Sequence, residues 1–163
     1  MERTAEYIRK TKETDILVEL QLDGGEIVLD TGIGFFDHML HAFAFYGGLG
    51  LTVQAKGDLQ VDGHHTVEDV GIVLGEALRG AFGEKTGIRR FASAYVPMDE
   101  ALLFAALDVS GRPYLVFDAP MPQERCGEYD TCLTVEFMRA FAMHAALTLH
   151  MKAFYGANAH HIT

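Results

Sequence analysis

Alternating apolar and polar side chains predict three strands in the first third of the chain. Positions 16–22 place an apolar residue at every second position, which is the pattern of a strand with one buried face. An Asp-Gly-Gly turn at 23–25 leads into a second apolar segment at 27–29, and positions 51–56 alternate again. Each of these segments is expected to turn one face toward a core.

Two helices are expected among these strands. The first runs from about Phe35 to Tyr46 and ends at Gly47-Gly48, because glycine readily adopts the left-handed conformation that ends a helix. The second has apolar residues at helical spacing and ends near Gly83. Its apolar positions are Val67, Val70, Leu74, Ala77, Leu78 and Ala81. The first half therefore runs strand, strand, helix, strand, helix.

The chain also matches itself. Residues 51–56 precede a His-His pair at 64–65, and residues 147–152 precede a second pair at 160–161, with an offset of 96 between the two copies. Leucine, threonine, lysine and both histidines recur in register. Agreement over this length points to an internal repeat.

Two further segments agree in the same order. Residues 38–45 line up with 136–143 at an offset of 98 and share an Ala-Phe-Ala core. The strand that ends at 22–23 resembles the one that ends at 107–108. The offset grows along the chain because the second half contains a longer connection, roughly 110–131.

The repeat predicts one duplicated domain of the α+β class, built as a sheet with helices packed on one face. The single domain comprises residues 1–163, with half-repeats at about 10–87 and 95–163. We expect the second repeat to be incomplete, because the register predicts a glutamate immediately after Thr163.

Composition narrows the class of protein. A chain of 163 residues with 49% hydrophobic content can bury the core of one domain. Its net charge of −10 argues against nucleic acid or a membrane surface as a partner, since both attract basic proteins. A charged N-terminus without a signal peptide and two isolated cysteines, Cys126 and Cys132, predict a cytoplasmic protein with reduced thiols.

The paired histidines suggest metal chemistry. If His64 opens a helix, Glu68 lies one turn away on the same face, while His65 points about 100° from His64. Neighbouring histidines on one helix can hardly bind the same ion, so two pairs suggest two metal positions with ligands from several segments and more than one subunit. Imidazole and carboxylate without thiolate suit manganese, iron(II) or zinc. The alternative is that each pair lies on the surface or caps a helix.

Other polar residues extend the candidate site. His38 and its repeat counterpart Glu136 are plausible further ligands. The sparse cations Arg90, Arg112 and Arg125 could bind an anion, because a guanidinium matches the oxygens of a phosphate. Glu13 begins the first predicted strand and could be either a surface residue or an acid/base. His41, His144 and His150 lack a counterpart in the repeat and are expected to be structural or exposed.

Four motifs together resemble the imidazoleglycerol-phosphate dehydratase family of histidine biosynthesis, over about residues 11–163. They are Asp37-His38-Met39-Leu40, Gly63-His64-His65-Thr66-Val67-Glu68-Asp69, Asp108-Val109-Ser110-Gly111-Arg112-Pro113-Tyr114 and Asn158-Ala159-His160-His161. The resemblance implies a tandem duplication of a split β-α-β unit. It also implies self-association into trimers and a twenty-four-subunit shell, with active sites between subunits.

The resemblance further implies a reaction and its cofactor. Imidazole glycerol phosphate would lose water to give imidazole acetol phosphate, by way of a metal-bound imidazolate that expels the hydroxyl group. Two Mn²⁺ ions are expected in each active site, and Fe²⁺ or Zn²⁺ would suit the same ligands. Metal-dependent hydrolysis and a non-catalytic metal-binding or assembly role are the alternative functions.

By position, the resemblance assigns roles to particular residues. The implied metal ligands or their immediate partners are His38, His64, His65, Glu68, His160 and His161, and the repeat adds Glu136 as a further candidate ligand. Glu13, His65 and Glu68 would be catalytic, with Glu13 as the acid/base and a substrate contact. Arg90, Arg112 and Arg125 would bind the substrate and its phosphate. Ala42 replaces a glutamine that is common in the family, and Glu136 replaces a common histidine.

Overall fold

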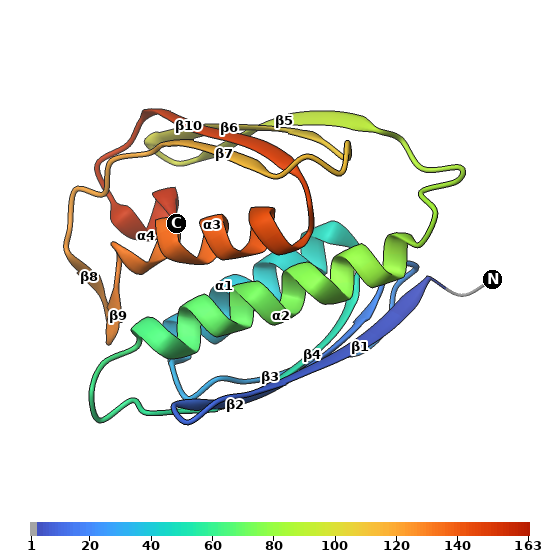
Figure 1. Ribbon diagram of the computed structural model, residues 1–163. Helices are drawn as coiled ribbons and strands as arrows, with labels where there is room; N and C mark the ends of the chain where they lie inside the picture. The colour runs from blue at the N-terminus through green and yellow to red at the C-terminus, as the bar shows by residue number, and fades with distance from the viewer. Residues whose placement is uncertain (1–2) are drawn as a thin grey trace.

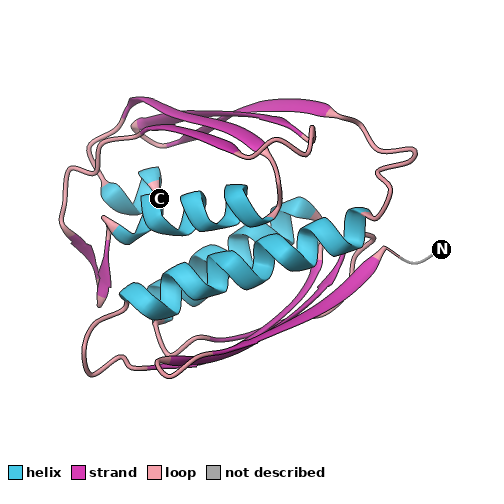
Figure 2. Ribbon diagram, in the orientation of Figure 1, coloured by secondary structure: helices cyan, strands magenta, loops and turns pink. Residues whose placement is uncertain are grey.

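The computed structural model describes residues 3–163, and its two four-stranded sheets form outer layers with the helices between them (Figures 1 and 2). The first half contains β1 (Thr4–Lys10), β2 (Thr14–Gln21), β3 (Ile27–Asp30), α1 (Gly34–Gly47), β4 (Gly50–Gly57) and α2 (His64–Phe82). The second half contains β5 (Phe91–Met98), β6 (Ala101–Asp108), β7 (Tyr114–Asp118), β8 (Arg125–Cys126), β9 (Tyr129–Asp130), α3 (Leu133–His144), β10 (Thr148–Tyr155) and α4 (Ala159–Ile162).

The two large sheets have the same topology. Sheet A has the strand order β1-β2-β4-β3, and sheet B has the order β5-β6-β10-β7. In each sheet the last two strands are parallel and are connected through a helix, as β3-α1-β4 and β7-α3-β10, while the other neighbours are antiparallel. The expected α+β class, with helices on one face of each sheet, is confirmed.

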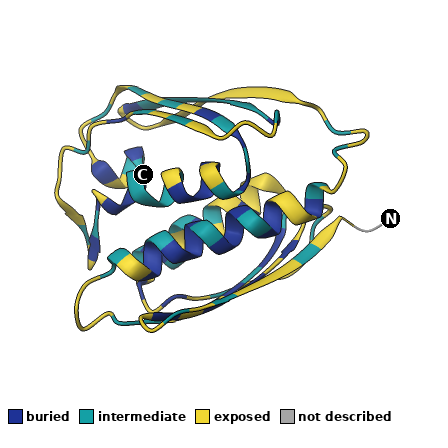
Figure 3. Ribbon diagram, viewed as in Figure 1, coloured by how far each residue is buried: buried dark blue, intermediate teal, exposed yellow. Residues whose placement is uncertain are grey.

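Burial follows the predicted periodicity (Figure 3). In β2, Ile16, Val18 and Leu20 are at most 1% exposed and face the helices. All six apolar positions predicted for the second helix are buried in α2. The first helix ends at Gly47, and Gly48 follows in the left-handed conformation with φ 64°. The main core therefore lies between sheet A and the helices.

The strands extend beyond the half-repeats expected from the sequence. β1 precedes the expected start at about residue 10, because its exposed edge position and charged residues hide the alternation. Residue 95, the expected start of the second half-repeat, lies inside β5, which begins at Phe91. The turn at 23–25 leads into β3, which pairs with β4 and not with β2.

The alignment of 22–23 with 107–108 was wrong. Leu107 lies opposite Leu149 in sheet B. The repeat counterpart of Leu149 is Val53, which lies opposite Val18 in sheet A. Leu107 therefore corresponds to Val18, because two residues that pair with equivalent residues of neighbouring strands are themselves equivalent.

The 19-residue α2 packs across β1 and β2 (Figure 1). In the second half α4 begins at the corresponding place, and residues 159–162 form its described part. Within residues 3–163, Val96 and Met98 of β5 are 54% and 47% exposed. None of the helices within residues 3–163 combines the length and the apolarity needed to cross a bilayer.

The helices α2 and α3 cross closely at Gly75. A Cβ atom at this position would lie 2.8 Å from the carbonyl oxygen of Phe141 and 2.9 Å from the backbone nitrogen of Ala145. Gly75→Ala is therefore expected to destabilise the fold by about 1–3 kcal/mol through overpacking, measured as the free energy of unfolding in urea. Gly34→Ala is the control, because a Cβ at Gly34 meets no atom within 4 Å. Equal stability of the two variants would contradict the prediction.

Candidate active site

The first His-His motif occupies the first turn of α2. The carboxylate of Asp62 accepts a hydrogen bond from the backbone N–H of His64, the first residue of the helix, at 2.8 Å. Nε2 of His64 lies 3.7 Å from Oε2 of Glu68, one turn later. The rings of His64 and His65 are 6.2 Å apart with their planes at 77°, so they point in different directions, as expected.

The second motif repeats this geometry in α4. The side chain of Asn158 accepts a hydrogen bond from the backbone N–H of His160 at 3.0 Å. The rings of His160 and His161 are 6.1 Å apart with an interplanar angle of 80°. Asp62 and Asn158 also stand 96 residues apart. These two hydrogen-bond acceptors were not predicted, although their residue types in register with the histidine pairs could have revealed them.

The second histidine of each motif is oriented by a carboxylate. Nδ1 of His65 lies 2.9 Å from Oδ2 of Asp58, and Nδ1 of His161 lies 2.7 Å from Oε2 of Glu100. When Nδ1 donates its proton to such a partner, Nε2 carries a free lone pair. The hydrogen bond to Asp58 and the charge of that carboxylate raise the pKa of His65.

The carboxylate of Glu100 is fully engaged. One oxygen accepts the backbone N–H groups of Ala157 and Asn158 at 2.9 and 2.8 Å, and the other contacts His161. The bond from Ala157 and then the bond from His161 lower the pKa of Glu100 to about 2. Glu100 is therefore a fixed anion that holds the loop before α4 and orients one ring.

Glu13 lies in the β1–β2 turn, near the first motif, and its carboxylate is not engaged. Its negative charge is one of those that raise the pKa of His65. Among residues 3–163 its exposed side chain forms no hydrogen bond or ion pair. The hairpin turns of the two halves thus present one free carboxylate, Glu13, and one bound carboxylate, Glu100.

The two halves meet at His38. This residue comes from α1, and its ring centre lies 5.4 Å from that of His160 in α4. Phe35 packs edge-on against His160 at 5.1 Å. Glu136, the counterpart of His38, forms an ion pair with Arg139 and none with a histidine of the described chain. Within residues 3–163, no three histidine, cysteine, aspartate or glutamate side chains come close enough together to hold a metal ion.

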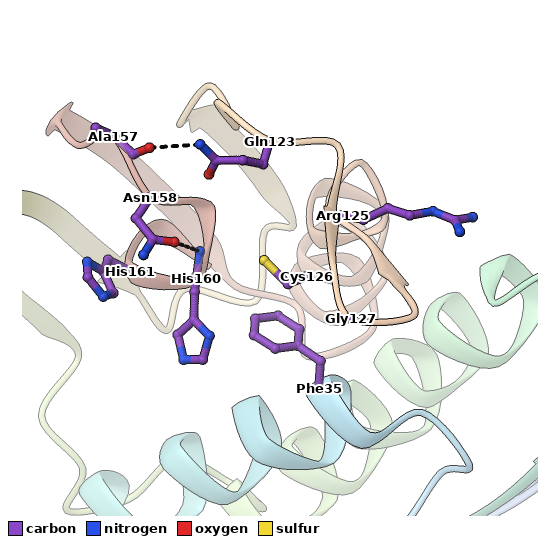
Figure 4. A pocket seen from close by; sticks show the side chains of 9 residues that line it. All are labelled: Phe35, Gln123, Arg125, Cys126, Gly127, Ala157, Asn158, His160 and His161. Atoms are coloured by element: carbon purple, nitrogen blue, oxygen red, sulfur yellow. Dashed lines mark hydrogen bonds between the residues drawn. The ribbon is translucent and has the colours of Figure 1, made fainter.

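A pocket of about 670 Å³ opens beside the second motif (Figure 4). It is lined by Phe35, Gln123, Arg125, Cys126, Gly127, Ala157, Asn158, His160 and His161. The side chain of Gln123 holds the loop between β10 and α4. It donates a hydrogen bond to the carbonyl oxygen of Ala157 at 2.9 Å and accepts one from the N–H of Ala159 at 2.6 Å. Arg125 points away from His160 in Figure 4 and pairs with Asp130 at 2.6 Å.

The other predicted anion-binding residues lie elsewhere. Arg90 contacts both oxygens of Asp108, at 2.7 and 3.1 Å, and Arg112 approaches the same carboxylate at 3.8 Å. Asp108 lies opposite Thr148 at the start of β10, whereas the second motif follows the end of that eight-residue strand. At about 3.3 Å per residue this separates them by roughly 25 Å. One chain therefore does not bring Arg90 and Arg112 to its own second histidine pair.

Comparison with known proteins identifies the family. A family model for imidazoleglycerol-phosphate dehydratase matches residues 31–163. The chain belongs to the imidazoleglycerol-phosphate dehydratase family. The enzyme of that name from Acetivibrio thermocellus is 58% identical over 163 residues, which cover 99% of this chain and 84% of the relative. The Symbiobacterium thermophilum enzyme is 57% identical over 162 residues, covering 99% and 78%.

Solved structures agree with this assignment. The crystal structure of the Staphylococcus aureus dehydratase has a TM-score of 0.88 at 38% identity and covers 97% of this chain and 88% of that chain. The Pyrococcus furiosus structure has a TM-score of 0.80 at 41% identity, with coverages of 95% and 83%. The chain is accordingly a dehydratase, a hydro-lyase, with the fold of these two relatives.

Tyr129 packs beside the pocket of this dehydratase. It is 2% exposed, packs 5.3 Å from Phe35 and 6.0 Å from Phe36, and lies 3.1 Å from the hydroxyl of Thr134. Burial raises the pKa of Tyr129 to about 12. Its phenol therefore stays neutral and holds the β8–β9 hairpin against the start of α1.

Proposed function

We propose that this chain dehydrates imidazole glycerol phosphate to imidazole acetol phosphate, in the histidine pathway of the cytoplasm, with Mn²⁺ as cofactor. The carrying observation is the pair of carboxylate–histidine contacts, Asp58 with His65 and Glu100 with His161. Such contacts orient imidazoles that bind metals and raise their basicity. Membership of the dehydratase family supports the reaction.

The donor groups fit a metal of this type. His64 with Glu68 and His38 with His160 supply nitrogen and oxygen donors, which suit Mn²⁺ and would also accept Fe²⁺ or Zn²⁺. Burial raises the pKa of Cys126, so this nearby thiol stays protonated and is a poor ligand. Bound metal would orient the imidazole ring of the substrate and stabilise its anionic form.

In this proposal, a second subunit completes the active site. No group of three donors forms within residues 3–163, and Arg90 and Arg112 lie at the far end of sheet B. We propose that a neighbouring copy contributes these two residues, which would grip the phosphate of the substrate. Self-association into trimers and a twenty-four-subunit shell would supply such neighbours. Arg125 is a further phosphate contact if its side chain turns into the pocket.

Glu13 is proposed to move the proton. Loss of water breaks one C–H and one C–O bond, and the resulting enol rearranges to the ketone of the product. An exposed carboxylate without a partner, close to His65, can accept the carbon-bound proton, and the resulting carboxylic acid can donate a proton to the departing hydroxyl. Glu100 is unsuited to this task because all its contacts would have to be broken first.

Incubation of the Mn²⁺-loaded enzyme with imidazole glycerol phosphate tests the proposal. Imidazole acetol phosphate should form without release of inorganic phosphate. Phosphate release from this substrate or from simple phosphoesters would instead show a metal-dependent hydrolase. Metal binding and assembly without any product would overturn the proposed catalytic function.

Asp58→Asn is expected to weaken Mn²⁺ binding about 10- to 100-fold, because His65 loses its charged orienting partner. The pH dependence should also change. Asp58 raises the pKa of His65, so protons compete with the metal up to a higher pH in the native protein than in the variant. The midpoint for loss of Mn²⁺ binding on acidification should therefore move to lower pH.

Isothermal titration calorimetry across the neutral range measures both quantities for Asp58→Asn. Asp118→Asn is the matched control, because Asp118 is an exposed carboxylate on sheet B that pairs with Lys152. An affinity and a pH midpoint equal to those of the native protein would contradict an orienting role for Asp58.

A further inference from the structure

Asp69 is a buried carboxylate next to Glu68 in α2, and it contacts the strands rather than the pocket. The residue is 8% exposed. Its Oδ1 accepts a hydrogen bond from Nε of Arg9 in β1 at 3.0 Å, and its Oδ2 accepts one from the hydroxyl of Thr14 in β2 at 2.5 Å. Asp69 therefore joins α2 to both strands of the hairpin whose turn carries Glu13.

The contacts continue from Thr14 to the backbone of Glu13. The hydroxyl oxygen of Thr11 accepts the backbone N–H groups of Glu13 and Thr14 at 3.1 and 2.9 Å. It also lies 3.1 Å from the hydroxyl oxygen of Thr14. Since Thr14 donates its proton to Asp69, Thr11 can donate to Thr14 while accepting both amides. Every donor in this chain of contacts then has an acceptor.

We propose that Asp69 is a positioning residue that fixes Glu13 relative to His65, acting through Thr14 and Thr11. These three residues, Asp69, Thr14 and Thr11, are called the Asp69 latch below. One rigid helix carries the histidine pair in its first turn and the latch carboxylate in its second turn. The spacing between the metal-binding groups and the acid/base is thereby set by α2. The inference rests on the proposed role of Glu13 in proton transfer.

The two halves hold the turn that carries the glutamate, Glu13 or Glu100, by different contacts. Glu100 is held by hydrogen bonds to its own carboxylate, which occupies the oxygens that a proton transfer would need. The turn of Glu13 is held through its backbone, so its carboxylate remains free. Strand register places Leu103 and Ala94 of sheet B where sheet A has Thr14 and Arg9, so the second hairpin lacks these latch contacts.

The test uses the full-length, Mn²⁺-loaded enzyme with Asp69→Asn, Thr14→Val and Thr14→Ser. Misplacing an acid/base by about 1 Å can cost roughly 100-fold in rate. Asp69→Asn and Thr14→Val should each lower kcat about 10- to 100-fold, while KM and Mn²⁺ affinity change less than about threefold. Thr14→Ser keeps the hydroxyl and should retain most of the turnover. The backbone amides of Glu13 and Thr14 should exchange faster with solvent in the two impaired variants.

Asp15→Asn is the matched control. Asp15 lies on the same hairpin, but its exposed carboxylate pairs with Lys10 at 2.6 Å and does not touch the latch. Its turnover should equal that of the native enzyme. Thermal unfolding of every variant separates misplacement from loss of the fold. If Asp69→Asn does not fold, the proposal is decided by the turnover of Thr14→Val compared with that of Thr14→Ser.

Combination with Glu13→Gln shows whether the latch acts through Glu13. Asp69→Asn should cause no further loss in a Glu13→Gln background, and a full additional loss would overturn the proposal. Normal turnover in folded Asp69→Asn and Thr14→Val, beside an impaired Glu13→Gln, would overturn the latch alone. Full turnover in Glu13→Gln would overturn the acid/base role itself, and the latch proposal with it.

Discussion

Glu13→Gln is expected to lower turnover of imidazole glycerol phosphate by about 10²- to 10⁴-fold, the range for loss of a general acid/base. Glutamine keeps the size of the side chain but cannot carry the proton. The side chain of Glu13 makes no hydrogen bond or ion pair among the described residues, so the substitution should leave the turn in place. Steady-state kinetics at saturating Mn²⁺ measures the effect, with Mn²⁺ affinity from calorimetry unchanged.

The matched control for Glu13→Gln is Glu19→Gln. Glu19 is an exposed glutamate on the outer face of β2, away from the helices. It should keep native turnover, which shows that the loss of one negative charge from sheet A is harmless. A Glu13→Gln variant with native turnover would exclude the proposed proton transfer.

His65→Ala is expected to have the second large effect. It removes an imidazole whose Nδ1 is already oriented by Asp58 and whose Nε2 is available for a metal. Mn²⁺ affinity should fall beyond the roughly 10- to 100-fold that loss of an outer partner causes. Turnover at limiting Mn²⁺ should fall in parallel, and removal of the metal from the native enzyme with a chelator should stop the reaction.

His150→Ala provides the comparison for His65→Ala. His150 is exposed on β10 and takes no part in either histidine pair. This variant should bind Mn²⁺ like the native protein. Binding by His65→Ala that matches the control would remove His65 from the metal site and would leave the first motif with a structural role.

Periodicity along the chain predicted those parts of the fold that depend on local sequence. The second helix was predicted nearly in full because all six of its predicted apolar positions are buried in α2. β1 was missed because an edge strand that is mostly exposed carries little alternation. The position of β4 between β2 and β3 depends on contacts between distant segments, which no local pattern encodes.

The candidate site was predicted unevenly for a related reason. The histidine pairs stood out because the repeat preserved them in register. Asp58 and Glu100 were not predicted, because the repeat does not align them. They contact equivalent histidines, but Asp58 lies in the loop after β4 and Glu100 lies in the β5–β6 turn. Asp69 was visible in its motif, but only the structure shows that its carboxylate is buried against β1 and β2.

The core shared by the two halves has a consequence for folding. Tyr129, Leu133 and Phe141 of the second half lie in the same buried core as the apolar residues of β2 and α2. The first half therefore cannot complete this core while the second half is still being synthesised. We expect the backbone amides of α2 and α3 to become protected from hydrogen exchange together.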